Sequence, residues 1–265
     1  HRIARRQRQM CIRDRDTTSP LLLPAMMLTA MLAGAVWAGI AAALRAHFNA
    51  NEILVTLMLT YIASLLLDFV VRGPLRDPKS FGFPLTKMYP DAGLIDRMPL
   101  PFIGQIGQLH SGVLLALVLV PVIWFVLQRS LPGYQITVAG LAPRAARFAG
   151  FSDRLIIYGG LAASGAMAGL AGMVEVSANI GQLQPNVSFG YGFTAIIVAF
   201  LARLNPVATI LAGLVIAMAE LGGDNAQIAL GIPKVVSGLF KGILLFYLMA
   251  SATLQQYRIE WKGRA

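Results

Sequence analysis

Long apolar runs separated by short polar segments make up most of the chain. A helix needs about 20 mainly apolar residues to cross the hydrocarbon core of a bilayer. One apolar run, at 193–202, is too short for an ordinary crossing unless it begins nearer Val187. The pattern predicts an all-α polytopic integral membrane protein with about six to seven transmembrane helices. The longer apolar runs occupy residues 21–44, 53–71, 113–127, 155–174, 206–221 and 235–250.

Two segments interrupt this apolar pattern. Residues 72–111 contain six prolines and charges of both signs, which predicts a long external loop with a short surface helix. Residues 181–192 hold Gln182, Asn186 and Ser188 among three glycines. We expect irregular or re-entrant backbone there, because such backbone persists at membrane depth only where protein buries it or where it lines a wet cavity.

Composition agrees with a membrane protein. Hydrophobic residues make up 57% of the chain, charged residues 13%, and the mean hydropathy is +0.67. The net charge of +10 could suggest a nucleic-acid partner, but residues 1–20 alone hold six arginines against two aspartates. The remaining excess is explained by Lys and Arg beside membrane helices, so nucleic-acid binding is not favoured.

Residues 1–20 differ from everything that follows. They have no apolar periodicity, and RQRQMCIRDR resembles translated sequencing adaptor. We predict that this segment is a non-native or disordered basic tail, with a native basic cytoplasmic tail as the alternative. Cys11, the single cysteine, therefore gives no information about redox compartment.

A short basic segment, VAGLAPRAARFAGFSDR at 138–154, lies between two strongly apolar regions. Pro143 suits the first position of a helix and Gly150 suits the left-handed residue that ends one. About two helical turns fit between them. At about 100° per residue, Arg144, Arg147 and Phe148 share one face, and Ala145, Ala146 and Ala149 share the other. The alternative is a solvated loop between membrane helices.

Small residues recur every fourth position in the run at 155–174. Without a hydrophobic driving force in lipid, small residues at this spacing let two helix backbones approach closely. We therefore predict that this helix packs tightly against another. The row consists of Gly160, Ser164, Ala168 and Gly172, with Gly165 and Gly169 beside it.

Signatures of catalysis are missing from the sequence. There is no G-x-x-x-x-G-K-[ST] loop for nucleotide phosphates. The histidines at 1, 47 and 110 have no metal-ligand spacing and no partnering cysteines. We therefore expect no enzymatic activity, no bound cofactor and no metal in this chain.

The pattern G-x-x-P-R-A-A-x-x-A-G at Gly140–Gly150 resembles the coupling loop of bacterial ABC-importer permeases. NEILVTLMLTYIA from Asn51 is similar to another block of that family, although the family usually has Asn where this chain has Thr60. SGAMAGLAGMVEV, SFGYGFTAIIVAFLARLNP and GGDNAQIALGIP are also similar, in the same order. The resemblance covers most of residues 21–255. It is to the ribose, branched-chain amino acid and nucleoside group, nearest the nucleoside and simple-sugar branch.

The resemblance implies a permease subunit in the bacterial plasma membrane whose N-terminal helices are missing from this sequence. Its expected partners are an ABC ATPase that uses ATP, a second permease subunit and an extracytoplasmic substrate-binding protein or lipoprotein. The solute would be a nucleoside or simple sugar. A branched-chain amino acid permease and an ion-coupled secondary transporter are the alternatives. The bias of Lys and Arg agrees with a cytoplasmic 138–154 and a cytoplasmic C-terminal tail at 256–265.

Two sets of residues are the candidates for function. The ATPase-coupling set is Gly140, Pro143, Arg144, Ala145, Ala146, Arg147, Ala149 and Gly150. Charges in apolar runs are costly unless paired or hydrated, so Lys241 joins the pathway set, with snorkelling of its side chain to the interface as the alternative. Glu175 and Glu220 are interpreted as interfacial. Asp224, Asn225 and Gln227 are expected in a turn that lines an outer mouth of the pathway, with a solvated turn as the alternative. The pathway set is Gln182, Asn186, Ser188, Asp224, Asn225 and Lys241.

Overall fold

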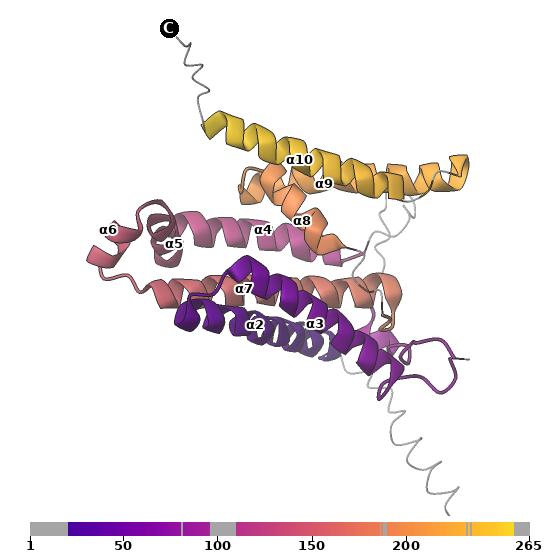
Figure 1. Ribbon diagram of the computed structural model, residues 1–265. Helices are drawn as coiled ribbons and strands as arrows, with labels where there is room; N and C mark the ends of the chain where they lie inside the picture. Colours follow the sequence, from indigo (N-terminus) through magenta and orange to yellow (C-terminus); the bar gives the residue numbers. More distant parts are fainter. Residues whose placement is uncertain are drawn as a thin grey trace, which may run out of the picture. The chain divides into compact units, whose positions relative to one another are not determined.

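The computed structural model describes residues 21–80, 82–95, 110–185, 187, 190–231, 233 and 235–256. Within these residues the regular structure is helical, apart from isolated β-bridge residues that include the antiparallel pair Arg76 and Thr86. The elements (Figure 1) are α2 (Leu22–Phe48), α3 (Glu52–Arg72), η1 (Asp91–Gly93), α4 (Gly112–Arg129), α5 (Leu131–Leu141), α6 (Pro143–Phe148), α7 (Asp153–Glu175), η2 (Val176–Ile180), α8 (Tyr191–Leu201), α9 (Pro206–Leu230) and α10 (Val235–Gln256).

Five described helices are long and apolar enough to cross a membrane: α2, α3, α4, α9, and α7 continued by η2. Helix α8 and the central part of α10 are shorter apolar helices. This confirms the predicted all-α polytopic membrane protein. The chain forms two compact units, unit 1 (His1–Leu115 and Leu131–Val187) and unit 2 (Ala116–Ser130 and Ser188–Ala265).

The contact between α2 and α7 is the centre of unit 1 (Figure 1). A Cβ added to Gly165 would lie 2.3 Å from the carbonyl oxygen of Gly34, and one added to Gly169 would lie 2.2 Å from that of Ala30. No real Cβ tolerates such distances, so the two backbones touch only because these positions are glycine. Close approach of this kind is how membrane helices gain packing energy where lipid supplies no hydrophobic drive.

The row of small residues on α7 that was predicted to pack does not form this contact with α2. A Cβ added to Gly160 or Gly172 would meet nothing within 4 Å, and Ser164 and Ala168 are exposed. The tight packing therefore uses Gly165 and Gly169, about 100° further around the helix. Both rows have four-residue spacing, so the sequence pattern alone could not distinguish the face that packs inside unit 1.

The loop after α3 folds against the end of α7. The Thr86 backbone N–H donates to the Leu183 carbonyl over 3.1 Å, and the Tyr89 N–H donates to the Gly181 carbonyl over 2.9 Å. The Leu183 N–H in turn donates to Thr86 Oγ1 over 2.9 Å. The non-helical residues after η2 thus have their backbone groups satisfied by a distant loop, as irregular backbone near a membrane requires. Burial raises the pKa of the Tyr89 phenol in this loop.

Unit 2 is built on α8, α9 and α10 (Figure 1). Its buried apolar side chains include Ile197 and Ala202 near α8 and Ala212 and Ile216 on α9. Asn205 caps α9 by accepting a hydrogen bond from the Val207 N–H over 3.0 Å, and Pro206 occupies the first turn.

Helix α9 continues through the sequence GGDNAQ, where a turn was predicted. The prediction of a turn is wrong, because single residues of low helix propensity lower the stability of a helix without ending it. The helix ends instead at Gly231, which has φ of 67° and whose N–H bonds the Gln227 carbonyl. Asp224 and Asn225 are therefore helical residues.

Candidate functional site

The segment predicted to couple to an ATPase is a chain of short helices between α4 and α7. Helix α5, Leu131–Leu141, was not predicted, and it contains Gly140. Ala142 interrupts the helical run, and α6 starts at Pro143, the predicted first position. Gly150 has φ of +78°, the left-handed conformation predicted for the residue after this helix.

Ala146 is the buried residue of α6, with no exposed surface. Its carbonyl accepts a hydrogen bond from the Phe151 N–H over 3.0 Å, and the Phe151 ring meets the edge of Tyr134 on α5 with ring centres 6.3 Å apart. The chain turns back on itself here and closes over Ala146. The predicted three-alanine face is therefore not an open surface: Ala145 and Ala149 are exposed, whereas Ala146 packs inside.

The outer face of α6 is apolar and basic. Phe148 is 94% exposed and Leu141, at the end of α5, is 83% exposed. Arg144 is also exposed, whereas Arg147 pairs with Asp153 at the start of α7, with Nε and Oδ2 2.7 Å apart. This exposed pair links α6 to the start of α7, and Phe148 is the last residue of α6. A large aromatic side chain left exposed in the chain is typical of a contact surface.

A second candidate lies in unit 2, where Lys241 on α10 forms an ion pair with Glu220 on α9. The same carboxylate oxygen, Oε1, accepts a hydrogen bond from Thr194 Oγ1 of α8 over 3.4 Å. We call Thr194, Glu220 and Lys241 the polar cluster. Of these three, Lys241 was predicted in the pathway and Glu220 at the membrane interface, whereas Thr194 was not predicted.

The other predicted pathway residues are scattered. Asn186 and Ser188 lie outside the described residues. Gln182 is half-buried in the irregular segment of unit 1. Asp224 lies one helical turn beyond Glu220 on the same face of α9 and is half-buried, and Asn225 is exposed.

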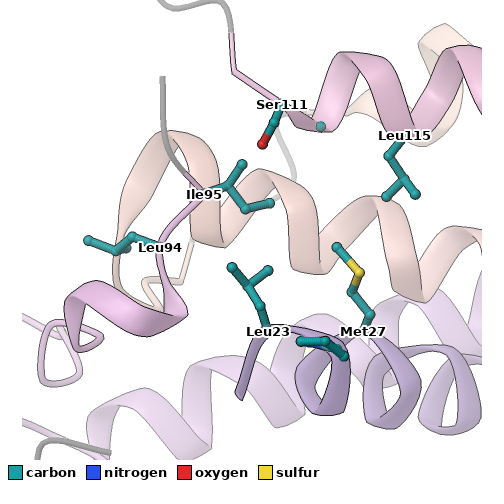
Figure 2. Close-up of a pocket in the computed structure, with 8 residues that line it drawn as sticks. Leu23, Met27, Leu94, Ile95, Ser111 and Leu115 are labelled. Carbon is teal, nitrogen blue, oxygen red and sulfur yellow. The ribbon is translucent and has the colours of Figure 1, made fainter. Parts of the chain in front are cut away.

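Unit 1 also holds an open cavity of about 340 Å³ (Figure 2). Leu23 and Met27 of α2, Leu94 and Ile95 of the loop, and Ser111 and Leu115 at the start of α4 line it, together with Pro24 and Gly112. The lining is almost entirely apolar and holds no titratable group. Among the described residues there is no group of His, Cys, Asp and Glu that could hold a metal ion.

These features define a polytopic helical membrane protein with two short helices, α5 and α6, between α4 and α7 and an ion pair between α9 and α10. The chain belongs to the family described as branched-chain amino acid transport system permease components, whose match covers residues 5–249. That match includes most of the basic segment at 1–20.

Three curated relatives are permeases of ABC transporters. The glucose permease TsgB13 of Haloferax volcanii is 34% identical over 247 residues, which is 90% of this chain and 64% of the relative. The guanosine permease NupP of Bacillus subtilis is 30% identical over 244 residues, covering 91% and 68%. The nucleoside permease NupB of Lactococcus lactis is 23% identical over 242 residues, covering 88% and 65%. The chain thus spans about two thirds of these relatives. No solved structure matches.

Proposed function

We propose that this chain is the permease subunit of an ATP-driven importer that carries a nucleoside or a simple sugar across a bacterial plasma membrane. ATP is used by a separate ATPase, and this chain catalyses no reaction itself. A second permease subunit completes the pathway, and a substrate-binding protein or lipoprotein delivers the solute outside. Residues 138–154 and the C-terminus face the cytoplasm.

The exposed tip of α6 is the observation that carries this proposal. Phe148 projects from a helix that is fixed to α5 through the fold over Ala146 and to α7 through the Arg147–Asp153 pair. A displacement of Phe148 by a partner would therefore be transmitted to α7. We infer that the partner at α6 is the ATPase, because the relatives are permeases of ABC transporters.

The solute class is supported by the three relatives, whose names specify glucose, guanosine and nucleosides. The family description mentions branched-chain amino acids. Uptake of glucose, guanosine and leucine by one reconstituted transporter would therefore separate the main proposal from the amino-acid alternative. Uptake driven by an ion gradient without ATP would support the secondary-transporter alternative.

Phe148→Asp tests the coupling role. We expect it to reduce copurification of the ATPase and ATP-driven uptake by about tenfold or more, since loss of a central aromatic contact typically costs about 2 kcal/mol or more. Phe83→Asp is the matched control, because Phe83 is 66% exposed in the loop after α3, and that loop bonds residues beyond the end of α7 that is opposite to α6. Normal ATPase copurification and uptake with Phe148→Asp would overturn the coupling role of α6.

Ala145→Trp adds a test of the exposed part of the alanine face. Added volume at a packed interface displaces the partner, so this substitution should weaken the ATPase complex if Ala145 is covered there. Ala146→Trp would not serve this purpose, because Ala146 is buried within the chain and its replacement would disturb the fold.

A further inference from the structure

The polar cluster lies on three apolar helices of unit 2, of which α9 is long and apolar enough to cross a membrane. Glu220 is about 21 Å from the start of α9 and about 15 Å from its end, and Lys241 is about 9 Å from the start of α10, at 1.5 Å per residue. Glu220 also follows the buried Ile216 by one turn. A charge at such depth costs several kcal/mol in hydrocarbon unless it is paired or hydrated.

Pairing alone does not remove this cost, because the pair is not enclosed. The side chains of Lys241 and Glu220 keep 26% and 29% of their surface exposed in the chain. An exposed ion pair facing lipid would still lose most of its hydration. The surface that carries the polar cluster therefore requires a polar environment, which in a transporter is the wet pathway of the solute.

The pair also has bonding capacity that the described part of the chain does not use. Glu220 Oε1 is bonded to both Lys241 and Thr194, and no described group bonds Oε2. An ammonium has three donors, of which one described bond to Glu220 occupies one. Among the described residues, the polar cluster thus presents an unused acceptor close to unused donors, on an ion pair whose own charges cancel.

We propose that Thr194, Glu220 and Lys241 form a contact site for a neutral solute that carries adjacent hydroxyl groups, such as a sugar ring or the ribose of a nucleoside. This inference rests on the proposed function and names the residues that meet the solute in unit 2. A hydroxyl group both donates and accepts, so one hydroxyl donates to Glu220 Oε2 while its neighbour accepts from Lys241 Nζ. Charge-assisted hydrogen bonds of this kind are about twice as strong as neutral ones.

The balanced charge also disfavours other solutes. An anion is attracted by Lys241 and repelled by Glu220, and a cation meets the reverse, so the pair itself favours neither. An apolar side chain would leave the free donors and acceptor of the polar cluster without partners, which costs free energy. The site therefore fits a polyhydroxylated neutral molecule better than leucine or an ion.

The double variant Glu220→Gln, Lys241→Met tests the site in the complete transporter, reconstituted with its ATPase and binding protein. Replacing both members of an ion pair by groups of similar size leaves no unpaired charge and is often neutral for stability. With radiolabelled glucose and guanosine as probes, we expect about tenfold or more less solute moved per ATP hydrolysed, with normal complex yield and normal ATPase stimulation by the binding protein.

The control is Asp68→Asn, Arg72→Met, which removes an exposed pair with Nε and Oδ1 2.7 Å apart at the end of α3. It should leave the ratio of solute to ATP unchanged. An unchanged ratio in the Glu220 and Lys241 double variant would overturn the proposal. So would a parallel fall of yield, ATPase activity and uptake, because that result would make the pair a clamp between helices.

A second measurement does not depend on ATP-driven uptake. In a Cys11→Ser background, Thr194→Cys should react with a water-soluble thiol reagent, and saturating glucose or guanosine should slow the reaction. Met218→Cys is the control, since Met218 is exposed on α9 but about 200° around the helix from Glu220. If Thr194→Cys is as unreactive as Met218→Cys, or reacts at a rate that neither solute changes, the site is overturned. Absence of ATP-driven uptake by the native transporter, with solute-protected labelling intact, would instead count against the proposed function.

Discussion

The two units hold their helices together by opposite means. In unit 1, α2 and α7 meet backbone to backbone at Gly34, Gly165 and Gly169, with no room for a single added carbon. In unit 2, α8, α9 and α10 are joined by side chains that reach across from Thr194, Glu220 and Lys241. Membrane proteins use both small residues and polar groups to associate helices, and this chain assigns one to each unit.

The difference has a consequence for movement and solute access. A contact made of glycine backbones has one geometry, because any shift opens a void or creates a clash. A contact made of long flexible side chains can persist while helices shift slightly, and it leaves polar atoms for a third partner. We therefore interpret α2 and α7 as a rigid frame and the helices of unit 2 as the part that meets solute.

The largest effect is expected from adding one methyl group to the frame. Gly165→Ala places a Cβ 2.3 Å from the Gly34 carbonyl oxygen and 2.5 Å from the Ala38 Cβ, so the helices must separate. We expect a loss of about 3 kcal/mol or more in the free energy of unfolding, measured as loss of thermal stability and of yield in detergent.

Gly160→Ala is the matched control on the same helix. A Cβ at Gly160 meets nothing within 4 Å, so this variant should be neutral or slightly more stable, because alanine favours helix by about 1 kcal/mol over glycine. Equal stability of the two variants would show that α2 and α7 do not rely on close backbone contact.

The next largest effect concerns the polar cluster. Glu220→Met leaves the ammonium of Lys241 without its partner, and we expect a loss of about 2–3 kcal/mol in stability, somewhat below the range for fully buried pairs because both side chains are partly exposed. Glu220→Met with Lys241→Met should recover most of that loss. A double-mutant cycle of thermal stability in detergent would measure the coupling. Additive single effects would mean that the pair does not interact in the membrane.

Hydrophobic runs predicted the main membrane helices well, because a bilayer-length apolar run has few other uses. They failed where a helix contains residues of low helix propensity. Helix α5 was missed because LPGYQITVAGL contains Pro132, Gly133 and β-branched residues, which favour other structures. Helix α9 was ended too early at Gly222 for a similar reason. In both places tertiary context overrides local propensity.

The candidate sites show the same limit. The start of α6 at Pro143 and the left-handed Gly150 could be predicted, since each depends on the conformational preference of one residue. The burial of Ala146 could not, because it depends on how the chain after Gly150 folds back. Nor could the pairing of Glu220 with Lys241, which lie on different helices; two opposite charges in adjacent apolar helices were the available signal.

A smaller effect is expected where unit 1 uses a polar contact of its own. Thr86→Val removes the Oγ1 that accepts from the Leu183 N–H over 2.9 Å. Thr86 is 7% exposed, so the orphaned N–H should cost about 1–2 kcal/mol, measured by thermal unfolding in detergent. Thr56→Val is the control, because the Thr56 hydroxyl donates only to carbonyls of its own helix. A loss in Thr86→Val no greater than in the control would mean that this loop contributes little to unit 1.

The smallest effect is expected at the brace of the coupling segment. Arg147 Nε and Asp153 Oδ2 are 2.7 Å apart, but the Arg147 side chain is 71% exposed. Because solvent screens the attraction, Arg147→Met should lower the free energy of unfolding by less than about 1 kcal/mol. If the pair transmits movement from α6 to α7, the rate of ATP-driven uptake should fall in Arg147→Met although the free energy of unfolding hardly changes. The measurement is ATP-driven uptake at low and high salt: native uptake should fall as salt screens the pair, and uptake by Arg147→Met should be lower and less sensitive to salt. Native rates and native salt dependence in Arg147→Met would show that the fold over Ala146 alone connects α6 to α7.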